Sequence, residues 1–126
     1  MILVDTSVWI EHLRHGDEFF KDLFQENICI HPMVIGELAC GNLRNRNQLL
    51  KLWSRLPSVV VASHEEVIML LNRNNLAGKG IGYIDAHLLA SAKIETDILI
   101  WTMDKRLAKI AESLNLLYVL KFHYRT

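Results

Sequence analysis

The chain has 126 residues, of which 51% are hydrophobic, 22% are charged and only two are proline. This composition predicts one folded domain spanning residues 1–126, and it excludes a disordered, fibrous or multidomain chain. The 14 basic and 14 acidic residues balance to a formal net charge of zero, so no overall positive charge indicates a nucleic-acid partner.

Short apolar runs rich in Val, Ile and Leu, without polar alternation, predict strands that are buried on both faces. In chain order these runs are residues 2–4, 28–30, 59–62, 98–101 and 117–120. Segments with helical spacing lie between them, at residues 8–13, 34–43, 48–56, 65–76, 83–93 and 105–114. Because strand and helix alternate, we expect an α/β fold with a parallel sheet of about five strands, covered by helices on both sides.

Carboxylates directly follow two of the predicted strands. Asp5 comes after the run MILV and precedes Thr6 and Ser7, whereas Thr102 and Asp104 follow DILIW. Ligands of parallel α/β folds gather beyond the carboxyl ends of the strands, so both carboxylates are in position for a functional site. Acidic residues are also favoured helix N-caps, and position alone leaves the two interpretations open.

Two further carboxylates lie on predicted helices. Asp85 projects into the apolar stripe of its own helix, beside Leu88, Leu89 and Ala92. It must therefore be protonated, paired with a cation, or placed at a helix end that opens onto a cleft. Glu37 lies at the edge of an amphipathic helix, which alone is the pattern of a solvated residue.

If these four carboxylates converge, each pair about 5 Å apart would repel by roughly 3 kcal/mol at an effective dielectric constant of about 20. Divalent cations would relieve this repulsion, and all-oxygen ligation favours Mg²⁺ or Mn²⁺ over zinc. His12 and His15 form an H-x-x-H pair on one helix face, but no third ligand is spaced nearby.

Four motifs occur together in the chain: LVDTSVWI at the start, IGELACG around Glu37, IGYIDAHLLASA around Asp85 and WTMDKRLAKIA around Asp104. In this combination the chain resembles the PIN-domain ribonucleases, and especially the VapC toxins of type II toxin–antitoxin systems. The resemblance extends over almost the whole chain. It implies a PIN-domain fold, with a five-stranded parallel sheet in the order 3-2-1-4-5 flanked by helices, in which Asp5 and Asp104 meet at the switch point.

The same resemblance implies a quartet of metal-binding and catalytic acids, formed by Asp5, Glu37, Asp85 and Asp104. Thr6, Ser7 and Thr102 are the hydroxyl residues that would orient these acids or bind water. We hypothesise that Mg²⁺ or Mn²⁺ activates a water that hydrolyses RNA, leaving 5′-phosphate and 3′-hydroxyl ends. We expect Asp5 and Asp104 as direct ligands, Asp85 as a bridging or water-mediated ligand, and Glu37 as the residue that orients the attacking water.

Cationic side chains would hold the RNA backbone. The candidates are Arg14, Arg44, Arg46, Lys79, Lys105 and Arg106, within a pool that also includes Lys51 and Arg55. Surface Lys and Arg are usually just solvated, so we expect no more than about half of this pool to contact RNA. The glycines Gly78, Gly80 and Gly82 do not follow a strand, which disfavours a phosphate-cradling loop and favours a flexible approach to the helix of Asp85.

The resemblance also implies a cognate VapB-like antitoxin that blocks the site, an RNA substrate such as tRNA or mRNA, and a homodimer. Apolar surface on the first helices and around Trp53 is the expected place for a dimer contact. Two cysteines without a C-x-x-C pair, and no long apolar run, predict a cytoplasmic protein without a membrane segment.

Two related functions stay open: a PIN-domain RNA-processing nuclease outside toxin–antitoxin systems, and a non-catalytic PIN-like binding module. The intact quartet argues against the binding module. A phosphatase that forms an aspartyl phosphate on Asp5 would typically carry Asp-x-Asp, and Ser7 stands at the second acidic position.

Overall fold

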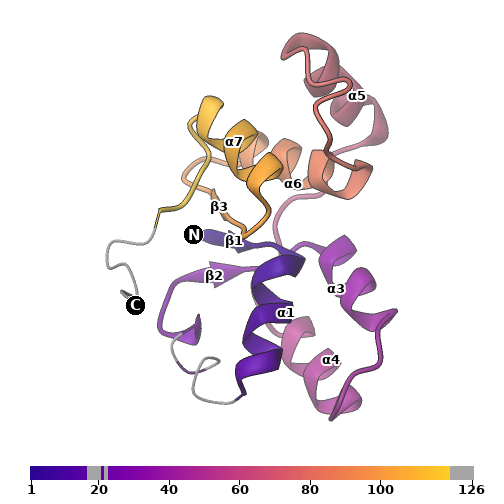
Figure 1. Cartoon of the computed structure of the whole chain (residues 1–126), viewed down its shortest axis with the longest axis vertical. Helices are drawn as coiled ribbons and strands as arrows, with labels where there is room; N and C mark the ends of the chain where they lie inside the picture. The colour runs from indigo at the N-terminus through magenta and orange to yellow at the C-terminus, as the bar shows by residue number, and fades with distance from the viewer. Residues whose placement is uncertain (17–20, 22, 120–126) are drawn as a thin grey trace.

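The computed structural model describes residues 1–16, 21 and 23–119. Its strands are β1 (Ile2–Val4), β2 (Ile28–Cys29) and β3 (Leu99–Trp101). Its helices are α1 (Thr6–His15), α3 (Pro32–Ala39), α4 (Arg46–Ser54), α5 (His64–Arg73), α6 (Tyr83–Ile94) and α7 (Lys105–Ser113) (Figure 1). The helical segments expected from spacing are therefore confirmed, with differences of a few residues at their ends.

The strands form a parallel sheet in the order β2-β1-β3. Ile2 lies opposite Ile28 of β2 and Leu99 of β3, and Val4 lies opposite Trp101. The first and fourth apolar runs of the sequence are thus neighbours, as expected. Since β1 pairs with β2 on one side and with β3 on the other, the strand order reverses at β1, and the carboxyl ends of β1 and β3 lie at this switch point.

The expectation of five strands is wrong for the outer two within the described residues. Residues 59–62 form no strand, and the chain makes only a single parallel bridge there, between Ser58 and Ile30. A second single bridge joins Ile100 to Leu117, while residue 120 of the run 117–120 lies outside the described residues. These bridges place the outer segments in the expected order 3-2-1-4-5, but the regular sheet has three strands.

The segment after Ser58 leaves the sheet because side chains from the C-terminal end of α6 and from its C-cap residue Glu95 bind its backbone. The backbone N–H of Val60 donates to the carboxylate of Glu95, and its carbonyl accepts from the hydroxyl of Ser91 at 2.7 Å. Both backbone groups of Val60 are then satisfied without a neighbouring strand. The apolar run predicted a strand because sequence spacing does not reveal such long-range side-chain partners.

Several helices begin where the sequence supplies a cap. The ring of His31 accepts the backbone N–H of Met33 at the start of α3, where Pro32 occupies the first turn. Ser63 and Glu66 form a reciprocal capping box at the start of α5. These caps join residues that are two or three positions apart, so the helix starts depend on local sequence.

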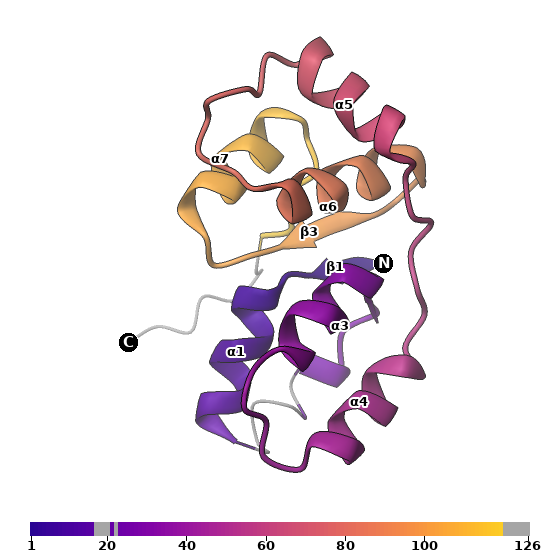
Figure 2. The same ribbon diagram turned by 90° about the vertical axis from the view of Figure 1, so that its right-hand side faces the viewer.

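The helices divide into two groups on either side of β1 (Figure 2). Helices α1, α3 and α4 lie together beside β2, whereas α5, α6 and α7 lie together beside β3. Leu3 and Val4 are fully buried between these groups, and the rings of Trp9 and Trp53 meet edge to face at 5.7 Å. Trp53 itself is fully buried in the core, whereas the neighbouring Leu52 and Ile10 on α1 are exposed, so the dimer contact expected on the first helices and around Trp53 stays a prediction.

In the part of the chain that the structure describes, no helix has both the length and the apolar character needed to cross a bilayer.

Candidate active site

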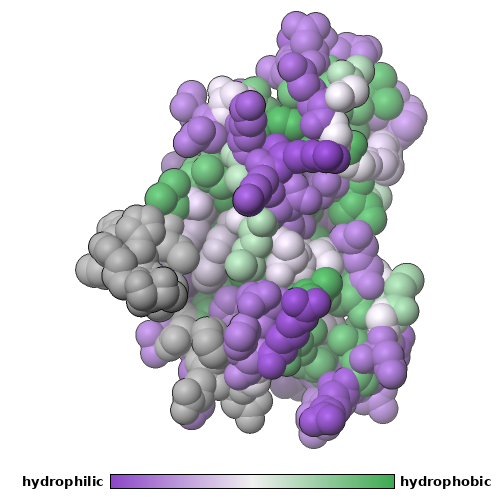
Figure 3. All heavy atoms as spheres, in the orientation of Figure 1, coloured by the Kyte–Doolittle hydropathy of each residue, from purple (hydrophilic) through white to green (hydrophobic). Residues whose placement is uncertain are grey.

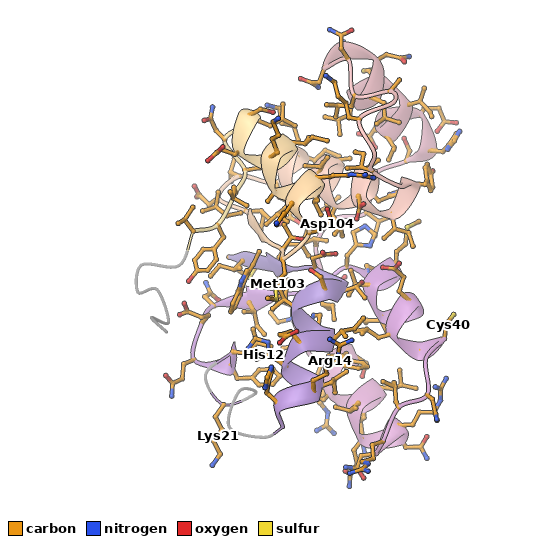
Figure 4. All side chains as sticks on the ribbon, viewed as in Figure 1. His12, Arg14, Lys21, Cys40, Met103 and Asp104 are labelled. Atoms are coloured by element: carbon orange, nitrogen blue, oxygen red, sulfur yellow. The ribbon has the colours of Figure 1, made fainter. Side chains whose placement is uncertain are left out.

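The candidate site lies where the carboxyl ends of β1 and β3 meet the first turns of α1 and α7. Figure 4 shows Met103 and Asp104 at this junction, near the N-terminal end of α1, with His12 and Arg14 further along that helix. Figure 3 shows hydrophilic residues over α7 and over α1 on the same face. The sheet topology thus brings together side chains from both ends of the sequence.

Asp5 occupies the N-cap position of α1, but its side chain makes no capping hydrogen bond. Its Oδ2 instead accepts the hydroxyls of Ser7 at 2.8 Å and of Thr102 at 2.7 Å. Each hydroxyl also accepts a backbone N–H, from Met103 at 3.0 Å and from Asp104 at 3.0 Å respectively. Asp5 is 5% exposed, and the two hydroxyls that bind its carboxylate are themselves hydrogen-bonded to the backbone.

Asp104 does cap its helix. Its Oδ1 accepts the backbone N–H groups of Arg106 at 2.9 Å and of Leu107 at 3.0 Å. Asp104 can therefore be both a helix cap and a residue of the functional site, because a carboxylate has a second oxygen. Capping fixes the direction of the side chain and leaves Oδ2 for another partner.

Glu37 reaches the same junction from α3. Its Oε1 accepts the hydroxyl of Thr6 at 2.6 Å, which links α3 to the first residue of α1. Both helices belong to the group beside β2, and they pack against each other. A glutamate that looked like a solvated residue in the sequence is therefore tied to the residue that follows Asp5.

Asp85 lies in the first turn of α6, where its Oδ2 accepts the backbone N–H of Gly82 at 3.2 Å. Burial raises the pKa of this half-buried carboxyl above its ordinary value, and the Gly82 hydrogen bond partly offsets that rise. Nearby negative charge raises the pKa further, and it comes from Asp5, Asp104 and Glu37. The four predicted acids are thus close enough to interact electrostatically, with Asp85 as the common member.

Each of these four carboxylates uses one oxygen for protein hydrogen bonds. Within the described residues, the other oxygen accepts none; these free atoms are Asp5 Oδ1, Glu37 Oε2, Asp85 Oδ1 and Asp104 Oδ2. Across the same residues, however, no group of three or more Asp, Glu, His or Cys side chains is arranged to hold a metal ion. The donor set suits a hard cation whose remaining ligands are water, rather than a closed protein cage.

The predicted RNA-binding cations fall into two groups. Lys105 and Arg106 lie in the first turn of α7, directly after Asp104, and Lys79 lies in the loop before α6. The others are not brought to the carboxylates by any contact among the described residues; they are Arg14, Arg44 and Arg46. Arg14 lies near the opposite end of α1 from the site (Figure 4).

Residues 2–113 match the family described as PIN domain. The chain belongs to the PIN-domain family. Among known relatives, this PIN domain is 46% identical over 115 residues to proteins named Ribonuclease VapC32 in two strains of Mycobacterium tuberculosis, CDC 1551 / Oshkosh and ATCC 25618 / H37Rv. The match covers 90% of this chain and 93% of the relative, which places this PIN domain in the VapC group.

Solved structures share the fold of this PIN domain. FitAcB from Neisseria gonorrhoeae matches with a TM-score of 0.63 and 23% identity, over 89% of this chain and 94% of that chain. A structure of FitAB bound to an IR36 DNA fragment matches with the same TM-score and 16% identity, over 98% of this chain and 100% of that chain. At these identities the similarity describes the fold.

Sequence reasoning did not assign a site role to Gly82. The glycine cluster was interpreted as an approach to α6, yet the Gly82 N–H holds the Asp85 carboxylate of this PIN domain. The spacing contained a usable signal, because an acidic residue three positions after a helix N-cap can accept the backbone N–H of the cap.

Proposed function

We propose that this PIN domain is a metal-dependent endoribonuclease that acts in the cytoplasm as the toxin of a toxin–antitoxin pair. The proposal is carried by the electrostatic coupling of Asp85 to the other three predicted acids, each of which keeps one oxygen free of protein hydrogen bonds in the described chain. Such a cluster favours cations at the junction. The relatives named Ribonuclease VapC32 support RNA as the substrate.

Mg²⁺ or Mn²⁺ fits this donor set, because every available donor is a carboxylate or hydroxyl oxygen. A preformed group of three ligands is not required, since Mg²⁺ usually keeps several waters and binds proteins through one or two carboxylates. When bound, such a cation supplies Lewis acidity at the phosphoryl group and lowers the pKa of a coordinated water.

The four acids would have different roles in binding the cation and the attacking water. Asp5 and Asp104 are proposed as direct ligands, because hydroxyls or backbone N–H groups fix one oxygen of each and leave the second available. Asp85 would bridge or bind through water, and Glu37, oriented by Thr6, would orient the attacking water. Attack of that water on phosphorus breaks the bond to O3′, which takes up a proton, so the products carry 5′-phosphate and 3′-hydroxyl ends.

The RNA backbone would be held by the cations next to the junction. Lys105 and Arg106 follow Asp104 directly in α7, and Lys79 lies in the loop that leads to the helix of Asp85. They would offset the negative charge that otherwise repels a polyanion.

The decisive experiment is RNA cleavage by purified protein with Mg²⁺ or Mn²⁺, and with a chelator added. Asp5→Asn should abolish cleavage without unfolding the protein, because the amide keeps the shape and removes the charge. Asp97→Asn is the matched control: Asp97 is exposed, lies outside the quartet, and has a positive φ of 63° that asparagine tolerates. Wild-type activity in Asp5→Asn, or cleavage that persists in chelator, would contradict the proposal.

Two further results separate the related functions. Expression of the wild type, but not of Asp5→Asn, should arrest growth, and co-expression of an antitoxin-like protein from the neighbouring reading frame should restore it. Metal-dependent cleavage without growth arrest would instead favour an RNA-processing nuclease. RNA binding without cleavage would favour a non-catalytic module.

A VapB-like antitoxin and a homodimer belong to the same proposal. The antitoxin should copurify with the chain and suppress cleavage. Sedimentation of the chain without antitoxin should give the mass of a dimer, and the mass of a monomer would remove this part of the proposal.

A further inference from the structure

The loop before α6 and the first turn of α7 touch at one unusually close point. Gly80 has a φ of +86°, a conformation that L side chains rarely adopt. A Cβ atom at this position would lie 2.7 Å from Cδ of Arg106 and 3.0 Å from its Nη1. Only glycine therefore allows the arginine side chain to lie where it does.

This contact joins the segments that carry two of the acids. Arg106 donates its backbone N–H to Asp104, and Gly82, two residues after Gly80, donates its backbone N–H to Asp85. In Figure 2 the connection between α5 and α6 passes beside α7. The arginine stem thus lies against the loop that leads to Asp85, two residues after Asp104.

The guanidinium of Arg106 has no partner of its own among the described residues, where it makes neither an ion pair nor a hydrogen bond. The side chain is exposed. An arginine two residues after an acidic helix cap would ordinarily pair with a nearby carboxylate, since the guanidinium fork matches a carboxylate. Among the described residues the guanidinium instead lies beside Gly80, with its donors unpaired and available to an outside anion.

We propose that Gly80 is a positioning residue that leaves room for the Arg106 side chain beside the loop, so that its guanidinium binds an RNA phosphate next to Asp104. This inference deepens the function proposed above and rests on it. A negatively charged site needs local positive charge to bring in a polyanion, and the space at Gly80 lets this charge lie between the segments that carry Asp85 and Asp104. The backbone contact is independent of base sequence, so it contributes affinity for RNA in general.

The test compares paired variants in the loop and on the helix. Arg106→Ala removes the guanidinium, and Arg106→Lys keeps only a point charge. Gly80→Ala introduces a methyl group into the space of the arginine stem. Gly78→Ala is the matched control, because Gly78 also has a positive φ, +77°, but has no atom within 4 Å of its would-be Cβ. Lys109→Ala removes an exposed charge elsewhere on α7.

Binding is measured by fluorescence anisotropy with a labelled single-stranded oligoribonucleotide of mixed sequence, in the Asp5→Asn background with Mg²⁺ present. Kinetics are measured in the active protein, with KM and kcat separated. Thermal unfolding of each variant shows whether it is folded.

Arg106→Ala should weaken RNA binding about fivefold at low salt and lower the slope of log K against log salt by about 0.7, the contribution of one phosphate on a single strand. Gly80→Ala should have the same effect, Arg106→Lys a smaller one, and Gly78→Ala and Lys109→Ala none. KM should rise with little change in kcat. The double variant Gly80→Ala/Arg106→Ala should bind no more weakly than Arg106→Ala alone.

An unchanged salt slope in Arg106→Ala overturns the proposal, as do additive effects in the double variant or equal effects of Gly78→Ala and Gly80→Ala. These outcomes are separate from failure of the proposed function. If the wild type cleaves RNA but Arg106→Ala binds RNA as tightly as the unsubstituted protein, only this inference is contradicted. If Arg106→Ala loses RNA binding but the wild type cleaves no RNA, only the proposed ribonuclease activity is contradicted.

Discussion

The hydroxyl of Thr102 donates to Asp5 Oδ2 at 2.7 Å, although the two residues are 97 positions apart in the chain. They meet because β1 and β3 pair in parallel with Val4 opposite Trp101, so the residues after the two strands emerge together. The same hydroxyl accepts the backbone N–H of Asp104 at 3.0 Å. One side chain therefore orients two of the proposed ligands.

Thr102→Val should lower the rate of RNA cleavage by about 10–100-fold, the usual cost of removing a group that orients a metal ligand. Valine keeps the shape, removes the donor to Asp5 and leaves the Asp104 N–H without its acceptor, so unfolding should also become about 1 kcal/mol easier. Thr102→Ser keeps the hydroxyl, so it should retain most of the cleavage rate and most of the stability. Urea unfolding and cleavage assays on the same samples provide the comparison, and full activity in the valine variant would show that the hydroxyl is dispensable.

Asp104 offers a way to separate capping from chemistry. Asparagine is an equally good N-cap, whereas alanine is a poor one, so Asp104→Ala should lose about 1 kcal/mol of stability that Asp104→Asn retains. Both variants should be inactive, because both remove the carboxylate. Residual activity in proportion to stability would mean that Asp104 acts only as a cap.

Asp85→Asn should stabilise the protein in metal-free buffer. Burial and three neighbouring acids raise the pKa of Asp85, so its ionised form is less favourable in the folded than in the unfolded state. The cost is present at neutral pH and disappears as the pH falls through the raised pKa and the carboxyl takes up a proton. We expect a Tm higher by a few degrees in Asp85→Asn at neutral pH, a difference that vanishes in acid, together with loss of cleavage. A lower Tm at neutral pH would contradict this sign.

His31 should make the fold sensitive to acid. It is fully buried, its Nδ1 accepts the Met33 N–H, and its Nε2 has no partner in the described chain. Burial, with a smaller contribution from the charge of His87, lowers the pKa of His31 from 6.5 to about 4. Between these two pKa values the unfolded chain therefore binds a proton at His31 that the folded protein does not bind. The free energy of unfolding should be highest above about pH 6.5 and fall by roughly 2–3 kcal/mol as the pH drops toward 4.

His31→Asn tests this dependence, because asparagine can cap α3 but does not titrate. The variant should be less stable overall, since a buried ring is lost, yet its stability should change less between neutral and acidic pH. Chemical unfolding across that pH range measures how the free energy of unfolding changes with pH. If this pH dependence is the same in the variant and the wild type, other groups cause the acid sensitivity.

Local sequence patterns predicted most of the helices and the three central strands. Apolar runs without polar alternation marked β1, β2 and β3, and Asp104 was recognisable as the N-cap of its helix. Those signals act over a few residues, which is why they can be recognised without a structure. The outer strand expected at residues 59–62 failed for the complementary reason: its backbone partners, Ser91 and Glu95, are more than thirty residues away.

The sequence by itself determined which side chains could form an acidic site: Asp5 and Asp104 follow buried strands, Asp85 lies in an apolar helix stripe, and the family resemblance adds Glu37. Only the tertiary structure decided that Asp5 is held by hydroxyls rather than capping α1, and that Gly80 makes room for Arg106. The physical reason is distance along the chain. Propensities and caps depend on near neighbours, whereas the orientation of a carboxylate depends on groups that a parallel sheet brings together from opposite ends of the sequence.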